Sequence, residues 1–112
     1  MTIIKDSPYT KKELGKLKEL FEVYIKTVID IEKGICCAGC DRHSDCEQLL
    51  LKKGSKQENL WGGGVDLAIK ITDCNSIINL KPKQGNRSNE IQDSKLFKKF
   101  EDLARNFFKE VL

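Results

Sequence analysis

The chain has 112 residues, of which 39% are hydrophobic and 33% are charged, and its formal net charge is +3. These values are typical of one soluble globular domain over residues 1–112, and the charge is too small to indicate nucleic-acid binding by itself. No apolar run approaches the length of a membrane span, and no secretory signal pattern is visible at the N-terminus. We therefore expect a cytoplasmic protein with no membrane partner.

The first third of the chain predicts a strand, a helix and a β-hairpin. Residues 2–5 favour a short strand. The capping-box pattern Thr10-x-x-Glu13 and the apolar residues at helical spacing after it predict a helix over 10–24. Segment 25–31 is rich in β-branched residues, and a Glu-Lys-Gly turn separates it from the apolar run 35–39. These two segments predict the hairpin.

The middle of the chain predicts a second helix and a short helical turn. The helix spans 43–53, with Ser44-x-x-Glu47 as its cap and Gly54 as its end. A further turn begins at Ser55 and ends at Trp61. Three glycines, 62–64, then break it.

The last third predicts two strands, a polar loop and a final helix. Alternating apolar residues predict a strand over 65–71, and 76–81 predicts a second strand, antiparallel to the first, that ends at Pro82. The loop 83–91 is polar. Asp93 or Ser94 caps a helix with an apolar stripe of Leu96, Phe100, Leu103, Phe107 and Val111. The whole chain thus predicts a two-layer α+β fold, with two to three helices over a largely antiparallel sheet.

Four of the five cysteines and the only histidine lie within eleven residues: Cys36, Cys37, Cys40, His43 and Cys46. Three thiolates and an imidazole are a possible zinc ligand set. Structural zinc sites usually draw their ligand pairs from separate segments, however, and these ligands follow one another at two-residue gaps. A disulfide framework is not expected in a reducing compartment. We favour buried, metal-free thiols, with zinc as the alternative.

His43, Asp45 and Glu47 form a second candidate site. His43 and Glu47 are four residues apart and share a helix face. Together with Asp30 or Glu32 of the hairpin, they are a conceivable ligand set for a divalent cation. The plainer interpretation, which we favour, is that acids in the first turn complement the helix dipole.

The third candidate is a segment dense in hydrogen-bond donors after the last predicted strand. Its polar members are Asn79, Lys81, Lys83, Gln84, Asn86, Arg87 and Ser88. Amides, a hydroxyl and cationic groups suit a phosphate or carboxylate ligand. An ordered loop whose amides cap backbone groups explains the same residues equally well.

Four motifs, Asp30–Gly34, His43-x-Asp45-x-Glu47, Gly54–Gly62 and Ile78–Ser88, resemble a family of small bacterial and archaeal proteins catalogued only as a domain of unknown function. The resemblance covers roughly 1–110 and implies no activity. The family pattern has no cysteines near its histidine. The resemblance therefore implies that a shared role rests on the histidine and the two acids rather than on the thiols.

The leading functional hypothesis is a binding domain for an anionic ligand, such as a nucleotide or a nucleic-acid phosphate. Arg87 and Lys81 would supply charge, and the neighbouring amides would orient the ligand; no cofactor is needed. The rival hypothesis is a hydrolase that uses His43 and nearby carboxylates around a divalent metal. A third is an interaction module in which an exposed sheet or Trp61 meets another protein.

Overall fold

Five strands form one antiparallel open sheet in the computed structural model, which describes residues 1–112. Their spatial order is β1-β3-β2-β4-β5, with bounds Ile3–Lys5 (β1), Tyr24–Asp30 (β2), Ile35–Ala38 (β3), Leu60–Asp66 (β4) and Ile71–Asp73 (β5). The helices are α1 (Lys11–Leu20), α2 (His43–Lys52) and α3 (Ser94–Phe107). The predicted α+β class with an antiparallel sheet is confirmed. None of the helices combines the length and the apolar character that crossing a membrane requires.

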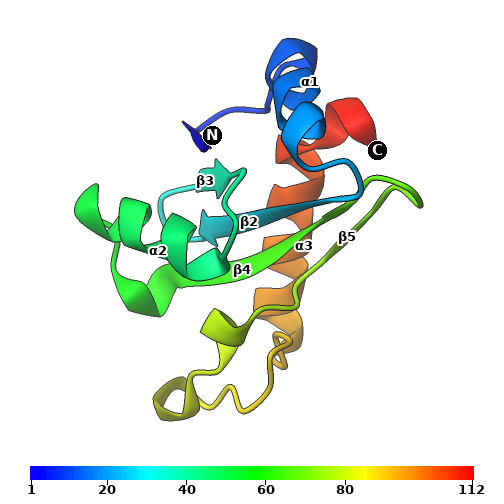
Figure 1. Ribbon diagram of the computed structural model, residues 1–112. Helices are drawn as coiled ribbons and strands as arrows, with labels where there is room; N and C mark the ends of the chain where they lie inside the picture. Colours follow the sequence, from blue (N-terminus) through cyan, green and yellow to red (C-terminus); the bar gives the residue numbers. More distant parts are fainter.

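Helices cover both faces of this sheet. Ile25 and Ile29 of β2 belong to a buried cluster that includes residues of α1 and α3. Val28, on the opposite face of the same strand, packs in a second cluster with Leu50 of α2. In Figure 1, α3 passes behind β2 and β4 while α2 lies on the nearer side. Both faces of the central strands are therefore removed from water.

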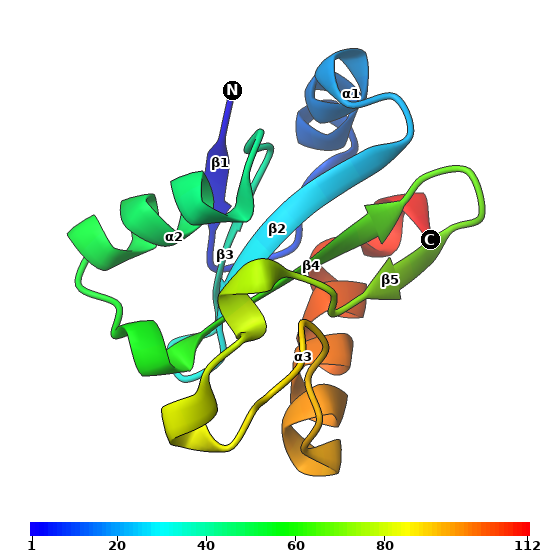
Figure 2. The same cartoon turned by 60° about the horizontal axis from the view of Figure 1, so that its bottom comes forward.

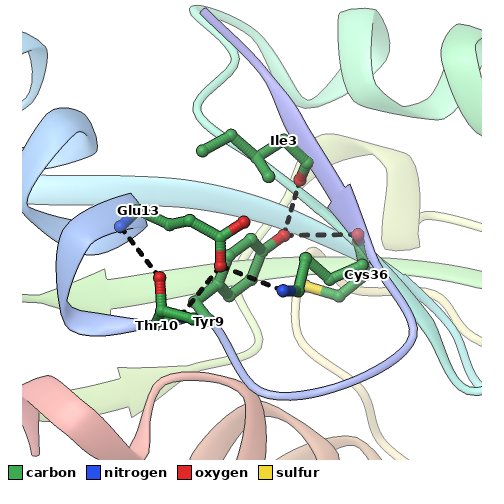
Figure 3. Close-up of polar contacts among 6 residues, drawn as sticks. Ile3, Tyr9, Thr10, Glu13 and Cys36 are labelled. Atoms are coloured by element: carbon green, nitrogen blue, oxygen red, sulfur yellow. Dashed lines mark hydrogen bonds and ion pairs between the residues drawn. The ribbon is translucent and has the colours of Figure 1, made fainter.

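Tyr9 ties the edge strand β1 to its neighbour β3. Its ring is buried, and its hydroxyl lies 2.7 Å from the carbonyl oxygen of Ile3 and 3.2 Å from that of Cys36 (Figure 3). Burial, together with the thiol of Cys36, raises the pKa of this phenol well above its usual range, so it stays a neutral donor. The short strand β1 thus has a side-chain anchor in addition to its ladder.

The first helix and the hairpin follow the prediction. Thr10 accepts a hydrogen bond from the Glu13 N–H while the Glu13 carboxylate accepts one from the Thr10 N–H, so the capping box is confirmed. The predicted hairpin is β2 and β3. The helix ends at Leu20 rather than at 24, because Tyr24 already pairs with β4 as the first residue of β2.

The second helix has a different cap from the predicted one. Arg42, not Ser44, is the N-cap residue, and its backbone N–H donates to the Asp45 carboxylate at 3.2 Å. The helix otherwise matches the expected span. A carboxylate in the first turn also complements the positive end of the helix dipole.

The three glycines lie inside a strand, so the prediction that they break a helical turn is wrong. The 3₁₀ turn Gln57–Asn59 ends before Trp61, and β4 runs through all three glycines. A Cβ on Gly63 would overlap the Asp73 carbonyl oxygen and lie 2.9 Å from the Phe100 ring. Glycine is required here because β5 and α3 approach the strand too closely for any side chain.

The two strands predicted after the glycines are also incorrect. The alternating segment 65–71 leaves the sheet at Asp66, whose carboxylate accepts hydrogen bonds from the next turn, and Ile69 is 62% exposed. Segment 76–81 contains a 3₁₀ turn, Ile77–Asn79, in place of a strand. Figure 2 shows this long connection between β5 and α3 in front of the sheet. It carries all of the predicted anion-binding residues.

The final helix matches its prediction closely. Asp93 caps it by accepting from the Leu96 N–H, and Phe100, Ala104 and Phe107 are buried against the sheet. Leu96 and Leu103 of the predicted stripe pack on the same cluster, and so does Val111, although it lies in the 3₁₀ turn Lys109–Val111 beyond the end of α3.

Candidate functional site

Asn79 completes the edge of β4. Its amide accepts from the Gly62 N–H at 2.8 Å and donates to the Gly62 carbonyl at 2.9 Å. The same NH₂ group also reaches the carbonyls of Cys74 and Asn89. The side chain is fully buried, and every hydrogen-bonding atom of its amide has a backbone partner.

Asn86 performs a similar role within the loop. Its NH₂ group lies within hydrogen-bond distance of the carbonyls of Asn79, Ser88 and Glu90, and its oxygen accepts from the Gln92 N–H. The two asparagines therefore organise the backbone of this segment. Both side chains make the contacts expected of an ordered loop whose amides cap backbone groups. These contacts leave no amide group of either residue free for a ligand.

Lys81 has a different environment from the other lysines. It is 9% exposed, its Nζ donates to the Gln57 carbonyl at 3.0 Å, and it lies 5.3 Å from the centroid of the Trp61 ring. No carboxylate forms an ion pair with it within 4.0 Å. Desolvation lowers the pKa of this ammonium, and the more distant charge of Glu47 offsets part of that shift.

An open cleft of about 520 Å³ lies beside Lys81. Lys83 and Gln84 line it, and Gln84 donates to the Glu58 carbonyl at 3.0 Å. Ile78 and Leu80 contribute apolar wall. The cleft thus combines two cationic groups with an apolar surface.

Arg87 and Ser88 lie outside this cleft. The Arg87 side chain is exposed, and its backbone N–H donates to the Gln92 side chain. The Ser88 hydroxyl accepts from the Glu90 N–H. The structure therefore brings Lys81, Lys83 and Gln84 together but not Arg87 or Ser88.

His43 lies over the glycines of β4 at the start of α2. Its Nε2 lies 2.7 Å from the carbonyl oxygen of Gly63, and its ring also borders Gly62. Burial lowers the pKa of the imidazole; the bond to Gly63 partly counteracts this, and the charge of Lys26 adds to it. The neutral ring therefore donates from Nε2.

The carboxylates near His43 do not converge. Asp45 caps α2, Glu47 is buried near the Gln57 amide, and Asp30 is buried with its oxygens bonded to the Ser55 hydroxyl and to two backbone N–H groups. No group of three or more His, Cys, Asp or Glu side chains is arranged to hold a metal ion. The structure thus does not assemble the alternative interpretation, a cation site of His43, Asp45 and Glu47.

The cysteines contradict the expectation that none is oxidised. Cys40 and Cys46 form a disulfide, with their Cα atoms 5.8 Å apart, because the first turn of α2 folds back over the preceding loop. Neither sulfur is then available for zinc. Cys36 and Cys37 remain buried thiols, and desolvation raises the pKa of each to about 12.

Trp61 is the residue near the cleft that sequence reasoning placed incorrectly. It is 2% exposed, so it cannot serve as the exposed contact of an interaction module. Its position in the interior follows from the unbroken buried run from Leu60 to Val65. The signal available in the sequence was that no polar residue interrupts Leu60 to Val65, since a strand covered on both faces need not alternate.

The comparisons with known proteins give one match. The family model described as "Protein of unknown function (DUF5674)" matches residues 2–107, nearly the whole chain. Neither the curated proteins nor the solved structures contain a match.

Proposed function

Since this chain belongs to the DUF5674 family, whose function is unknown, we propose a function from its geometry: the protein binds an anionic, phosphate-bearing ligand, such as a nucleotide, in the cleft beside Lys81. The ligand's charge would meet Lys81 and Lys83. Arg87, which the sequence suggested as a charge partner, is not needed.

The unpaired ammonium of Lys81 is the observation that carries this proposal. An ammonium has three N–H donors, and here one carbonyl accepts from it while no carboxylate pairs with it. Burying a charge without a counter-ion costs free energy. An anion in the adjacent cleft would restore the missing partner and recover part of that cost.

The rest of the cleft favours a ligand with both charged and apolar parts. Lys83 adds a second positive charge at the same wall, while Ile78 and Leu80 present carbon surface. Glu58 is the one acid of the lining. Two lysines against one acid leave a net positive lining, which suits a phosphate carried on a larger organic molecule.

Calorimetric titration with inorganic phosphate, pyrophosphate and nucleoside triphosphates tests the proposal. Specific binding should also raise the free energy of unfolding, by about 2.7 kcal/mol at a ligand concentration of 100 Kd, which denaturant unfolding would measure. Lys81→Met should abolish binding and Lys83→Ala should weaken it. The control, Lys12→Ala, removes the same charge from an exposed position on α1 and should bind normally. The proposal is wrong if no anion binds, or if the three variants weaken binding equally.

A further inference from the structure

Lys81 has the surroundings of a nucleophilic amine rather than those of a surface cation. The residue is buried, and its Nζ donates to one carbonyl oxygen, that of Gln57. No carboxylate pairs with it, and the ring of Trp61 lies beside the amine in place of water. An ammonium that lacks a counter-ion and most of its hydration is more easily deprotonated than one in solvent.

Burial is the larger influence on the charge of this amine. Desolvation lowers the pKa of Lys81, and the charge of Glu47 offsets part of that shift. The face of Trp61 also favours the charged form, but weakly, because an aromatic ring carries a quadrupole and no net charge. The neutral amine, whose lone pair attacks carbonyl carbons, is therefore more abundant at neutral pH than in an ordinary lysine.

The backbone around Lys81 holds this amine at the wall of the cleft. The Lys81 N–H donates to the Asn86 carbonyl at 2.9 Å, and the Lys81 carbonyl accepts from the Asn86 N–H at 3.1 Å. Gln57, whose carbonyl accepts from Nζ, lines the same cleft as Lys81. The hydrogen bond between the two residues therefore lies at the cleft wall, within reach of a ligand.

We propose that Lys81 forms an imine with the ligand of this cleft, which is then a phosphate-bearing aldehyde or ketone. This inference rests on the proposed function, because the phosphate occupies the same cleft beside Lys83. A carbonyl-bearing ligand uses both special features of the cleft, its positive lining and its desolvated amine.

The reaction needs no oxidant, reductant or further reactant. The lone pair of the neutral Nζ attacks the carbonyl carbon, so a nitrogen–carbon bond forms while the electrons of the carbonyl π bond move to oxygen. The two protons of the amine and the carbonyl oxygen then leave as water, and a carbon–nitrogen double bond remains. Protonation of the imine nitrogen by solvent restores the positive charge that an anionic ligand favours.

Reductive trapping in the native protein tests the proposal directly. Cyanoborohydride delivers hydride to the imine carbon and leaves a stable secondary amine. With glyceraldehyde 3-phosphate and cyanoborohydride, the intact mass should show a single adduct, and peptide mapping should place it on Lys81 while the exposed Lys12 remains unmodified. Labelling of Lys81 should also reach half of its maximum at a lower pH than labelling of Lys12.

Two variants and a second aldehyde are the controls. Lys81→Arg keeps the positive charge but has no amine that forms an imine, so it should lose the adduct. Lys12→Arg, at an exposed position of α1, should be labelled as the native chain is. Unphosphorylated glyceraldehyde at the same concentration should label Lys81 less, on the order of tenfold, because it lacks the contact of the phosphate with Lys83.

Calorimetric titration with inorganic phosphate separates the imine from anion binding. If phosphate binds but no adduct forms on Lys81, the imine is overturned and the anion cleft stands. If neither phosphate nor the aldehyde reacts with the cleft, both proposals are overturned. The imine is also overturned if exposed lysines are labelled as readily as Lys81, or if the two aldehydes label Lys81 equally.

Discussion

The amide of Asn79 pairs with both backbone polar groups of Gly62, as a residue of a neighbouring strand would. β5 covers only the second half of β4, since it pairs with Gly64, Val65 and Asp66. The side chain of Asn79 therefore stands in for the missing ladder and fixes the loop that carries Lys81. The position of the candidate site therefore depends on the hydrogen bonds between the Asn79 side chain and Gly62.

Asn79→Ala should be strongly destabilising, by about 3 kcal/mol, because it leaves the Gly62 N–H and several carbonyls buried without partners. Asn79→Asp should be at least as harmful, since a carboxylate cannot donate to the three carbonyls. Urea unfolding measures both. Asn75→Ala, at an exposed position in the same connection, is the control and should unfold at the native midpoint.

Gly63→Ala should cost about 3 kcal/mol or more, because a Cβ there collides with the Asp73 backbone and with Phe100. Gly15→Ala is the matched comparison: it lies on an exposed helical turn with nothing within 4 Å, and should stabilise by roughly 0.5–1 kcal/mol. Thermal unfolding of the two variants should therefore shift in opposite directions. Equal shifts would show that β4 is not packed as described.

Stability should fall in mildly acidic solution through His43. Its folded pKa lies below its ordinary value of 6.5, so below pH 6.5 the unfolded chain binds more protons than the folded one. The free energy of unfolding is therefore fully retained above pH 6.5 and is lost as the pH falls toward the folded pKa. Unfolding at neutral and mildly acidic pH should show this loss in the native chain and a smaller one in His43→Gln. Identical pH profiles would contradict it.

Lys81→Met should raise the free energy of unfolding, on the order of 1 kcal/mol, because a methionine of similar length fills the space without a buried unpaired charge. The exposed neighbour Lys83 should tolerate the same change with no effect. If Lys81 serves binding at the expense of stability, Lys81→Met should gain free energy of unfolding and lose affinity for anions. Destabilisation by Lys81→Met, measured by denaturant unfolding, would instead assign Lys81 a structural role.

Thiol titration of the unfolded chain should detect three reactive cysteines without reductant and five with it, since Cys36, Cys37 and Cys74 are free. Reduction should cost about 2 kcal/mol of stability, as expected for a short closed loop. The double variant Cys40→Ser/Cys46→Ser should unfold identically with and without reductant. Five thiols in the unreduced chain would exclude the disulfide.

The elements that depend on local chemistry could be predicted from the sequence. The capping box at Thr10, the turn at Gly34 between a β-branched run and an apolar run, and the apolar stripe of α3 all act over a few residues. Their physical causes, backbone capping and one-sided burial, are visible in the order of residues. The donor-rich loop was recognisable as a candidate site for the same reason.

The errors lie where distant segments decide the outcome. The three glycines are strand residues because β5 and α3 press against β4, and nothing within the segment records that approach. The alternation after them predicted a strand whose Ile69 is instead exposed in a turn. The disulfide likewise required the loop of Cys40 to meet the first turn of α2.

By itself, the sequence determined that polar donors gather between residues 79 and 88. Only the tertiary structure decided which of them are free. The amides of Asn79 and Asn86 are used on backbone groups, whereas Lys81 is buried without a counter-ion. Hydrogen-bond satisfaction depends on groups from several segments meeting in space, and so it is settled only when the chain is folded.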